Sequence, residues 1–210
     1  MKLKEWIESI KLALSFLTII PFKSDYSPSI LRKSLYFFSL SGIATGCIMF
    51  FTAKIASIFN PINFFLYASI ILLAEYLTSN FFHIDGYCDC SDALYFTKQG
   101  KDKHKILKDP HIGMYAASLL FFLFIIKIGL MISVVQNNYL KLLLLYPVSG
   151  YIPAFIQTLF FKPMFEEGLG NNLKKEISFK HLSVSVIFSF VLSGFLFNLI
   201  FAAIYVISVF

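Results

Sequence analysis

Three aspartates, Asp85, Asp89 and Asp92, are spaced four and three residues apart in the longest polar stretch of the chain. On a helix of 3.6 residues per turn this spacing places all three carboxylates on one face. Three like charges on one face repel one another, so a bound cation would stabilise the arrangement. Carboxylate oxygens are ligands of hard cations, and Mg²⁺ is held by one or two carboxylates together with substrate phosphate oxygens. The spacing therefore predicts a Mg²⁺ site, with a solvated acidic helix face as the alternative.

The polar stretch that holds these aspartates, residues 83–111, ends in a second group of candidate residues. Lys108 and Asp109 stand close to Gly113 at the entry to the next apolar segment. A lysine in this place can hold a phosphate, and Asp109 can complete a metal shell or act as a base. The predicted catalytic residues are therefore Lys108, Asp109 and His111, and the other lysines are interpreted as membrane flanks.

A further polar segment, residues 162–181, pairs two adjacent acids with two glycines. A surface turn needs one glycine and an asparagine, but not two neighbouring carboxylates as well. The composition therefore favours a substrate-binding loop over a plain turn. The binding residues predicted here are Glu166, Glu167, Gly168, Gly170 and Asn171, together with Gly86 and Gly113 of the first segment.

Cysteine and histidine in the first polar stretch raise the question of zinc. Cys88 and Cys90 are separated by one residue, whereas structural zinc sites use a spacing of two to four. The candidate histidines His83, His104 and His111 are scattered along the stretch. The odd total of three cysteines also argues against a disulfide framework. Mg²⁺ is accordingly the predicted metal, and zinc is the less favoured alternative.

The composition is that of a membrane protein. Hydrophobic residues make up 58% of the 210 residues and charged residues 14%, against roughly one-quarter charged in soluble domains. Several apolar runs approach the roughly 20 residues that cross a bilayer. The net charge of +6 does not indicate nucleic-acid binding, because Arg32 is the only arginine and the lysines lie between apolar runs.

These runs predict an all-α, polytopic membrane helix bundle in a single domain, residues 1–210, with about five to six transmembrane spans. An amphipathic helix at residues 3–20, lying in the headgroup plane, precedes the bundle. Gly42 and Gly46 predict a close approach of two helices, and Glu75, inside a span, is expected to be functional. The expected spans cover residues 35–58, 62–82, 114–135, 139–161 and 182–210, the last being either tilted or a span with a partial return.

The distribution of lysines predicts the orientation in the membrane. The N-terminal segment and the two polar segments carry nearly all of them, whereas the turns near residues 60 and 137 carry almost none. The positive-inside rule places lysine-rich pieces in the cytoplasm, and the span count puts all three on one side. We therefore expect a multi-pass protein of the cell membrane whose N-terminus and both polar segments face the cytoplasm and build one site.

Four motifs, which follow one another along the chain in the same order as in the family, resemble those of the cobalamin synthase family. Residues 83–94, HIDGYCDCSDAL, are similar to the signature H-x-DG-x-x-D-x-x-DG-[LV]. Residues 106–113 resemble the I-M-[KR]-D-[SP]-R-[IL]-G element, residues 166–171 the EGLG loop, and residues 15–21 the SFLTRIP helix. The resemblance covers most of the chain and is far more specific than three spaced aspartates.

The resemblance implies an adenosylcobinamide-GDP ribazoletransferase, a membrane enzyme that completes the nucleotide loop of vitamin B12. Its substrates would be adenosylcobinamide-GDP and α-ribazole, or α-ribazole 5′-phosphate, with Mg²⁺ as cofactor and GMP as the leaving group. Carboxylates that hold a cation, with lysines nearby, suit phosphoryl transfer, which chiefly needs positioning and charge neutralisation. Nothing in the sequence bears on the oligomeric state.

The chain departs from the family pattern at several positions. Ile19, His111 and Gly150 stand where the family has arginines, which hold phosphate through two hydrogen bonds. Ala93 replaces the glycine after the third aspartate. The chain also ends at Phe210, before the C-terminal acidic segment of the family, so we expect either a fragment or a short member with altered activity.

Two other classes of function fit parts of the sequence. Another Mg²⁺-dependent membrane phospho-alcohol or prenyl transferase would use the Asp89-x-x-Asp92 pair, but would need a second aspartate-rich segment or a further arginine. A transporter or a non-catalytic membrane scaffold would suit Glu75, although the polar groups gather at a surface and not at mid-membrane. The ribazoletransferase is the favoured function.

Overall fold

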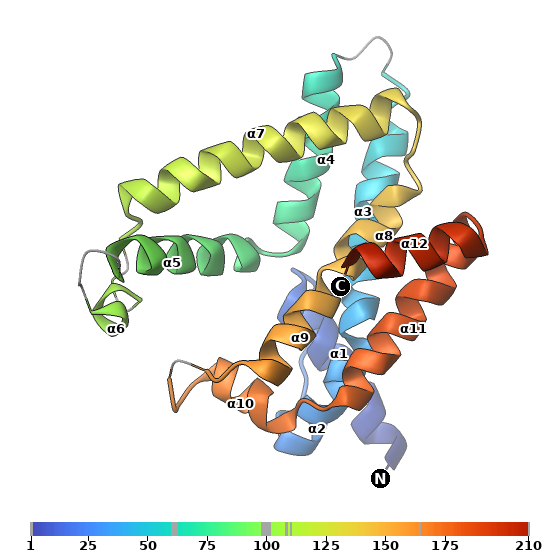
Figure 1. The fold of residues 1–210 in the computed structure, drawn as a ribbon. Coiled ribbons are helices and arrows are strands. Elements are labelled where there is room, and N and C mark those ends of the chain that lie inside the picture. Colours follow the sequence, from blue (N-terminus) through green and yellow to red (C-terminus); the bar gives the residue numbers. More distant parts are fainter. Residues whose placement is uncertain are drawn as a thin grey trace.

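The fold is built from helices, and no strand forms in the part of the chain that the computed structural model describes: residues 2–59, 63–97, 102–107, 109, 111–163 and 165–209. Figure 1 shows their arrangement. The elements are α1 (Lys2–Leu17), α2 (Pro28–Ser34), the 3₁₀ helix η1 (Leu35–Phe37), α3 (Phe38–Ala56), α4 (Phe64–Thr78), α5 (Phe82–Thr97), α6 (Lys103–Ile106), α7 (Met114–Gln136), α8 (Leu142–Ser149), α9 (Tyr151–Phe160), α10 (Leu169–Glu176), α11 (Phe179–Leu196) and α12 (Leu199–Val209).

Within the described parts of the chain, four helical stretches are long and apolar enough to cross a membrane, and α4 with α5 adds a fifth if the two make one broken span. The four are Pro28–Ala56, Met114–Gln136, Leu142–Phe160 and Phe179–Leu196. The predicted all-α membrane bundle is thereby confirmed. The last predicted span, 182–210, divides into α11 and the 11-residue α12, which packs against it as the predicted partial return.

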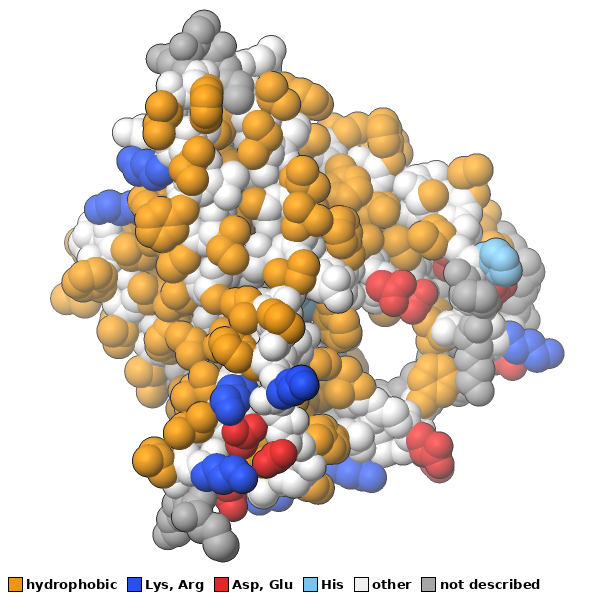
Figure 2. All heavy atoms as spheres, turned by 180° about the vertical axis from the view of Figure 1, so that it is seen from behind, with side chains coloured by type: hydrophobic (Ala, Val, Ile, Leu, Met, Phe, Trp, Pro, Cys, Tyr) orange, Lys and Arg blue, Asp and Glu red, His pale blue; other side chains and the backbone are white. Residues whose placement is uncertain are grey.

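Hydrophobic side chains cover much of the outer surface. Figure 2 shows them over most of one face, with charged side chains gathered mainly toward its lower end and one edge. The most apolar of the candidate spans, α7, is scarcely buried against the rest of the chain. Phe121, Ile126 and Leu130 on this helix are each more than half exposed. An apolar surface of this extent suits contact with lipid rather than with water.

A sharp turn separates α4 from α5 where one span over residues 62–82 was predicted. Asn80 and Phe81 adopt left-handed backbone conformations, with φ of 49° and 55°. Two successive left-handed residues cannot continue a right-handed helix. The two helices therefore meet at 91°, and α5 runs across the direction of α4 (Figure 1). We treat α5 as lying along the membrane surface, outside the spanning segments.

The contact between α3 and α8 is close because two glycines lie in it. A Cβ atom at Gly42 would lie 2.9 Å from Val148 Cα, and one at Gly46 would lie 2.7 Å from the carbonyl oxygen of Leu143. Neither distance leaves room for a side chain. The close helix approach that Gly42 and Gly46 predicted is confirmed.

Two buried clusters hold the bundle together, and Ile84 of α5 packs against the first of them. The first joins α3, α4, α7 and α8 around residues such as Met49 and Ile71. The second packs α1 and α9 against η1 and α3, with Leu17, Leu35 and Phe155 among its members. From this bundle α5 projects outward, and α7 returns along it, so that the two helices lie side by side (Figure 1).

Candidate functional site

The three aspartates predicted to bind a metal lie on one continuous helix, α5. Because Phe82–Thr97 is helical throughout, Asp85, Asp89 and Asp92 share one face, as their spacing predicted. Their surroundings differ. Asp85 is exposed in the first turn, Asp89 is half-buried, and Asp92 is only 5% exposed. The three carboxylates are therefore not equivalent.

Asp92 is held by the first turn of α7. Its carboxylate accepts hydrogen bonds from the backbone N–H groups of Gly113 at 2.6 Å and of Ala116 at 3.0 Å. The N–H groups at the start of a helix lack partners within the helix, and the helix dipole favours a negative charge there. Asp92 thus joins α5 to α7. Each of its oxygens accepts one of these bonds and keeps a further lone pair for a cation.

This contact requires glycine at position 113. A Cβ atom there would lie 2.6 Å from both carboxylate oxygens of Asp92, well inside van der Waals contact. Gly113 was predicted as a binding residue, and its position gives it a packing role as well. A side chain here would push the carboxylate away from the α7 N-terminus.

Gly113→Ala is expected to lower the free energy of unfolding by on the order of 2 kcal/mol, because two hydrogen bonds to a charged group are weakened. Thermal unfolding in detergent measures the change. Gly86→Ala on α5 is the matched control, since a Cβ there meets no atom within 4 Å and alanine favours a helix by about 0.5–1 kcal/mol over glycine. Equal melting temperatures for the two variants would contradict the proposed contact.

An acidic cavity of about 490 Å³ opens beside this contact. Asp89 and Asp92 line it from α5, and Asp109 lines it from the segment before α7. Asp102 and Lys105 also line it, although the sequence analysis did not single them out as site residues. Their only sequence signal was their place in the same polar stretch. Asp85, near the start of α5, is not part of this lining.

Asp109 and His111 are hydrogen-bonded to each other, and both line the acidic cavity. Asp109 Oδ1 lies 2.7 Å from His111 Nδ1 and accepts from the His111 backbone N–H at 3.0 Å. The hydrogen bond with the His111 ring, helped by the one from its backbone, lowers the pKa of Asp109 below the usual range. A low pKa favours a charged, ligating role for Asp109 over the role of a base. Lys108 lies outside the described residues.

The acidic face of α5 is electrostatically unfavourable without a cation. Partial burial raises the pKa of Asp89, and the charges of Asp85 and Asp92 raise it further. The carboxylate oxygens of the cavity suit Mg²⁺, which usually retains several waters. Among the described residues, however, no three His, Cys, Asp or Glu side chains converge closely enough to hold a metal ion. The cavity thus has donors of the right chemistry but no preformed cage.

The alternative zinc site gains no support from the positions of the two cysteines in this stretch. Cys88 is buried, whereas Cys90, two residues along the same helix, is exposed. Residues two apart on a helix do not face each other, so the two thiols cannot bind the same metal ion. The side chain of His104 lies outside the described residues.

The second predicted binding segment leads directly into α10. Gly168 has a φ of 100°, which favours glycine, and the helix begins at the next residue. The Asn171 side-chain amide donates a hydrogen bond to the carbonyl oxygen of Glu166. This bond ties the first turn of α10 to the loop before it.

The acids of this segment do not share the acidic cavity. Neither Glu166 nor Glu167 is part of its lining. Gly170, in the first turn of α10, has open space around it and is not required by packing. The structure therefore does not bring the two acidic segments together there, and α10 instead lines a second cavity through Leu169 and Leu173, with Ile177 directly after the helix.

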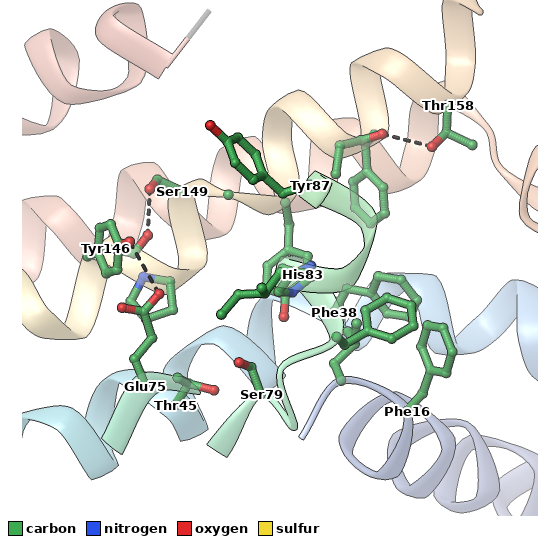
Figure 3. Close-up of a pocket in the computed structure, with 18 of the residues that line it drawn as sticks. Phe16, Phe38, Thr45, Glu75, Ser79, His83, Tyr87, Tyr146, Ser149 and Thr158 are labelled. Atoms are coloured by element: carbon green, nitrogen blue, oxygen red, sulfur yellow. Dashed lines mark hydrogen bonds between the residues drawn. The ribbon is translucent and has the colours of Figure 1, made fainter. Parts of the chain in front are cut away.

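This second cavity, of about 540 Å³, is mostly apolar and aromatic, and Figure 3 shows residues from several helices around it. His83 and Tyr87 line it from α5, on the side of the helix away from Asp89 and Asp92. We call it the aromatic cavity. α5 is thus a wall with an acidic face and an aromatic face.

A largely but not fully buried ion pair lies in the wall of the aromatic cavity. Lys127 Nζ of α7 donates to both carboxylate oxygens of Glu75 of α4, at 2.9 and 3.1 Å. The Tyr146 hydroxyl of α8 donates to the same carboxylate at 3.2 Å, as Figure 3 shows. The sequence singled out Glu75 but did not predict its partners.

Comparison with known proteins assigns the chain to a family. The family model for cobalamin-5-phosphate synthase matches residues 9–210. The chain is similar to the adenosylcobinamide-GDP ribazoletransferase of Clostridioides difficile strain 630, with 27% identity over 192 residues, covering 90% of this chain and 74% of that protein. No solved structure matches the chain.

Other curated relatives carry the same name. The protein of Clostridium tetani strain E88 is 27% identical over 190 residues, which cover 89% of this chain and 75% of the relative. The protein of Clostridium perfringens strain ATCC 13124 is 25% identical over 152 residues, covering 71% and 60%. The chain thus spans about 60 to 75% of the length of these relatives.

The motif-based resemblance is confirmed by these matches, and with it the prediction of a transferase family that acts in cobalamin biosynthesis. The apolar helices agree with a multi-pass membrane protein. Because the family model covers nearly the whole sequence, the chain belongs to the cobalamin-5-phosphate synthase family.

Proposed function

We propose that the chain transfers the adenosylcobinamide-phosphate group of adenosylcobinamide-GDP to α-ribazole, or to α-ribazole 5′-phosphate, and releases GMP. One observation carries the proposal: a cavity lined by carboxylates and a lysine, in a chain of this family. The names of the curated relatives, which include both adenosylcobinamide-GDP and ribazole, support it.

The reaction moves one phosphoryl group between two oxygen atoms. A hydroxyl oxygen of the ribazole attacks the phosphorus that carries the cobinamide, and the bond from that phosphorus to the GMP oxygen breaks. GMP leaves with the electron pair of the broken bond, and the hydroxyl proton passes to a carboxylate of the cavity. Such a transfer needs chiefly positioning and neutralisation of negative charge.

Mg²⁺ is the cofactor of the proposed reaction. When bound, it would neutralise charge on the transferred phosphoryl group. Asp89 would hold it, with the remaining lone pairs of Asp92 as further ligands, and Asp85, which lies outside the cavity lining, would add negative charge on the same helix face. Lys105, which lines the same cavity, would balance the rest of the phosphate charge. Asp109, oriented by its hydrogen bond with His111, would complete the set of carboxylate ligands.

We further propose that the acidic cavity faces the cytoplasm. Lysine-rich segments flank the apolar helices on the side of α5 and α6, which supports this orientation under the positive-inside rule. The position of α5 across the direction of α4 agrees with a helix at the membrane surface.

The proposal is tested with the purified chain in detergent, supplied with adenosylcobinamide-GDP, α-ribazole and Mg²⁺, by following GMP release. We expect turnover that stops when EDTA removes the metal and resumes when Mg²⁺ is added in excess. A parallel reaction with α-ribazole 5′-phosphate identifies the preferred acceptor. Absence of GMP release with both acceptors would reject the function for this chain.

A further inference from the structure

The joint between α4 and α5 has a strained backbone. Asn80 and Phe81 both adopt the left-handed conformation, with φ of 49° and 55°. Asparagine commonly takes this conformation just beyond the end of a helix, so Asn80 is an ordinary residue to end α4. Phenylalanine is not, because a bulky side chain is disfavoured at positive φ. Such a conformation persists only where the surrounding structure holds it, and it is typical of functional sites.

Contacts with α4 provide part of this support. The Phe81 backbone N–H donates to the carbonyl oxygen of Tyr76 at 3.0 Å, and the rings of the two residues are stacked with 6.1 Å between their centres. These contacts fix Phe81 on the end of α4. They do not fix the direction of α5, which begins at the next residue and leaves α4 at 91°.

The end of α1 contacts both sides of the joint. The backbone N–H of Ile19, two residues beyond α1, donates to the carbonyl oxygen of Thr78, the last residue of α4, at 2.7 Å. Phe16, in the last turn of α1, lies edge-on to Phe82, the first residue of α5, with 5.4 Å between the ring centres. On its other side Phe16 lies beside Phe38 of α3, at 6.2 Å (Figure 3).

α1 itself is fixed to the rest of the bundle. Ala13 and Leu17 belong to the second buried cluster, and Phe16 packs against that cluster. The Ser41 hydroxyl of α3 donates to the carbonyl oxygen of Ala13 at 3.0 Å. These contacts are made with α3, η1 and α9 and not with α4 or α5. α1 can therefore hold the joint from a fixed position.

We propose that the end of α1 positions α5 for the reaction, with Phe16 as the positioning residue. Phe16 acts through Phe82, because their ring contact holds the first turn of α5, while Asp92 holds the second half of α5 on the start of α7. Support at both points sets the direction in which Asp89 enters the acidic cavity. This inference rests on the proposed function, which assigns that cavity to phosphoryl transfer. It gives a role to the N-terminal motif, residues 15–21.

The position of α5 can be measured without turnover. Cys90 is exposed on α5 and can carry a nitroxide label once Cys47 and Cys88 are replaced by alanine. A second label is attached through Gln157→Cys on α9. Pulsed electron paramagnetic resonance in detergent then gives the distribution of distances between the two helices. We expect one narrow distribution in this background and a clearly broader one after Phe16→Ala, because the first turn of α5 loses its support.

Turnover provides the second readout. Phe16→Ala is expected to lower kcat roughly 10- to 100-fold with little change in KM, since a displacement of about 1 Å at a reacting group has an effect of this order. Phe16→Tyr keeps the ring and should keep both kcat and the narrow distribution. Trp6→Ala is the matched control on the same helix, because its ring contacts Tyr36 and Phe37, ahead of α3, from the other end of α1.

The outcomes separate this inference from the proposed function. A broader distribution in Phe16→Ala, but not in Phe16→Tyr or Trp6→Ala, supports the positioning role even where no GMP is released. If Phe16→Ala does not fold, Phe16→Leu, which keeps an apolar side chain but not the ring, is measured in its place. An unchanged distribution overturns the inference, as does equal broadening in Trp6→Ala. An unchanged kcat in active protein also overturns it, while the function stands.

Discussion

Asp89→Asn is expected to reduce Mg²⁺-dependent GMP release by at least about 100-fold, the range seen when one charge-stabilising group is removed from an active site. Asp89 is the least constrained carboxylate that α5 contributes to the acidic cavity, because Asp92 is already bonded to the start of α7. Asparagine has nearly the same shape but carries no charge. Asp85→Asn is expected to act in the same direction but more weakly, because Asp85 adds charge on the same face without lining the cavity.

The same substitution is expected to leave the fold intact and to stabilise it slightly at neutral pH when Mg²⁺ is absent. The pKa of Asp89 is raised in the folded chain, first by burial and then by Asp85 and Asp92. The unfolding free energy therefore falls as pH rises from the unfolded pKa, about 3.9, through the folded pKa. Asparagine removes this unfavourable charge. Thermal unfolding between pH 4 and 8 measures the difference.

Added Mg²⁺ provides a readout that does not depend on turnover. A ligand that binds only the folded state raises the melting temperature, so Mg²⁺ should stabilise the wild-type chain and stabilise Asp89→Asn less. Asp25→Asn is the control, since Asp25 is exposed and its carboxylate pairs with Lys4 at 3.8 Å, far from the acidic cavity lining in the sequence. Full GMP release by Asp89→Asn, or an undiminished response to Mg²⁺, would remove Asp89 from the metal site.

Local patterns in the sequence were sufficient to predict the helices and the acidic face. The spacing of Asp85, Asp89 and Asp92 could be interpreted because all three lie within one helix, where position on the helix fixes direction. Gly42 and Gly46 predicted a close helix contact for the same reason, since small residues four apart lie on one side.

The partners of these residues could not be predicted, because they come from distant parts of the chain. Asp92 is bonded to groups 21 and 24 residues later, and Glu75 to a lysine 52 residues later. No periodicity links such positions. The turn at Asn80 and Phe81 was also unexpected, because its left-handed residues include a phenylalanine, which rarely adopts that conformation.

Those distant contacts changed the interpretation of the site. The spacing predicted three metal ligands on one face, but the fold engages Asp92 in hydrogen bonds, leaves Asp85 outside the cavity lining and adds Asp102 to it. A helix face is therefore a good guide to which carboxylates are neighbours. It does not show which of them meets the partners that the rest of the chain supplies.

Lys127→Met is expected to lower the free energy of unfolding by about 3–5 kcal/mol, because it leaves the Glu75 carboxylate buried without its counter-ion. The pair joins α4 to α7 through two hydrogen bonds, at 2.9 and 3.1 Å, inside a mostly apolar wall. Glu75→Gln alone should also destabilise the chain, since it leaves the ammonium group without its counter-ion. Chemical unfolding in one detergent measures each variant.

The double variant Glu75→Gln with Lys127→Met is expected to regain most of the stability lost in Lys127→Met, because removing both charges together leaves neither unpaired. The exposed pair Lys4–Asp25 is the control: its side chains are 78% and 71% exposed, and surface pairs contribute at most about 1 kcal/mol. A coupling energy for Glu75 and Lys127 no larger than that of the surface pair would mean that water reaches the pair. Recovery in the double variant would instead show that the ion pair adds no net stability to the fold. Such a result is expected of charged groups that serve ligand binding.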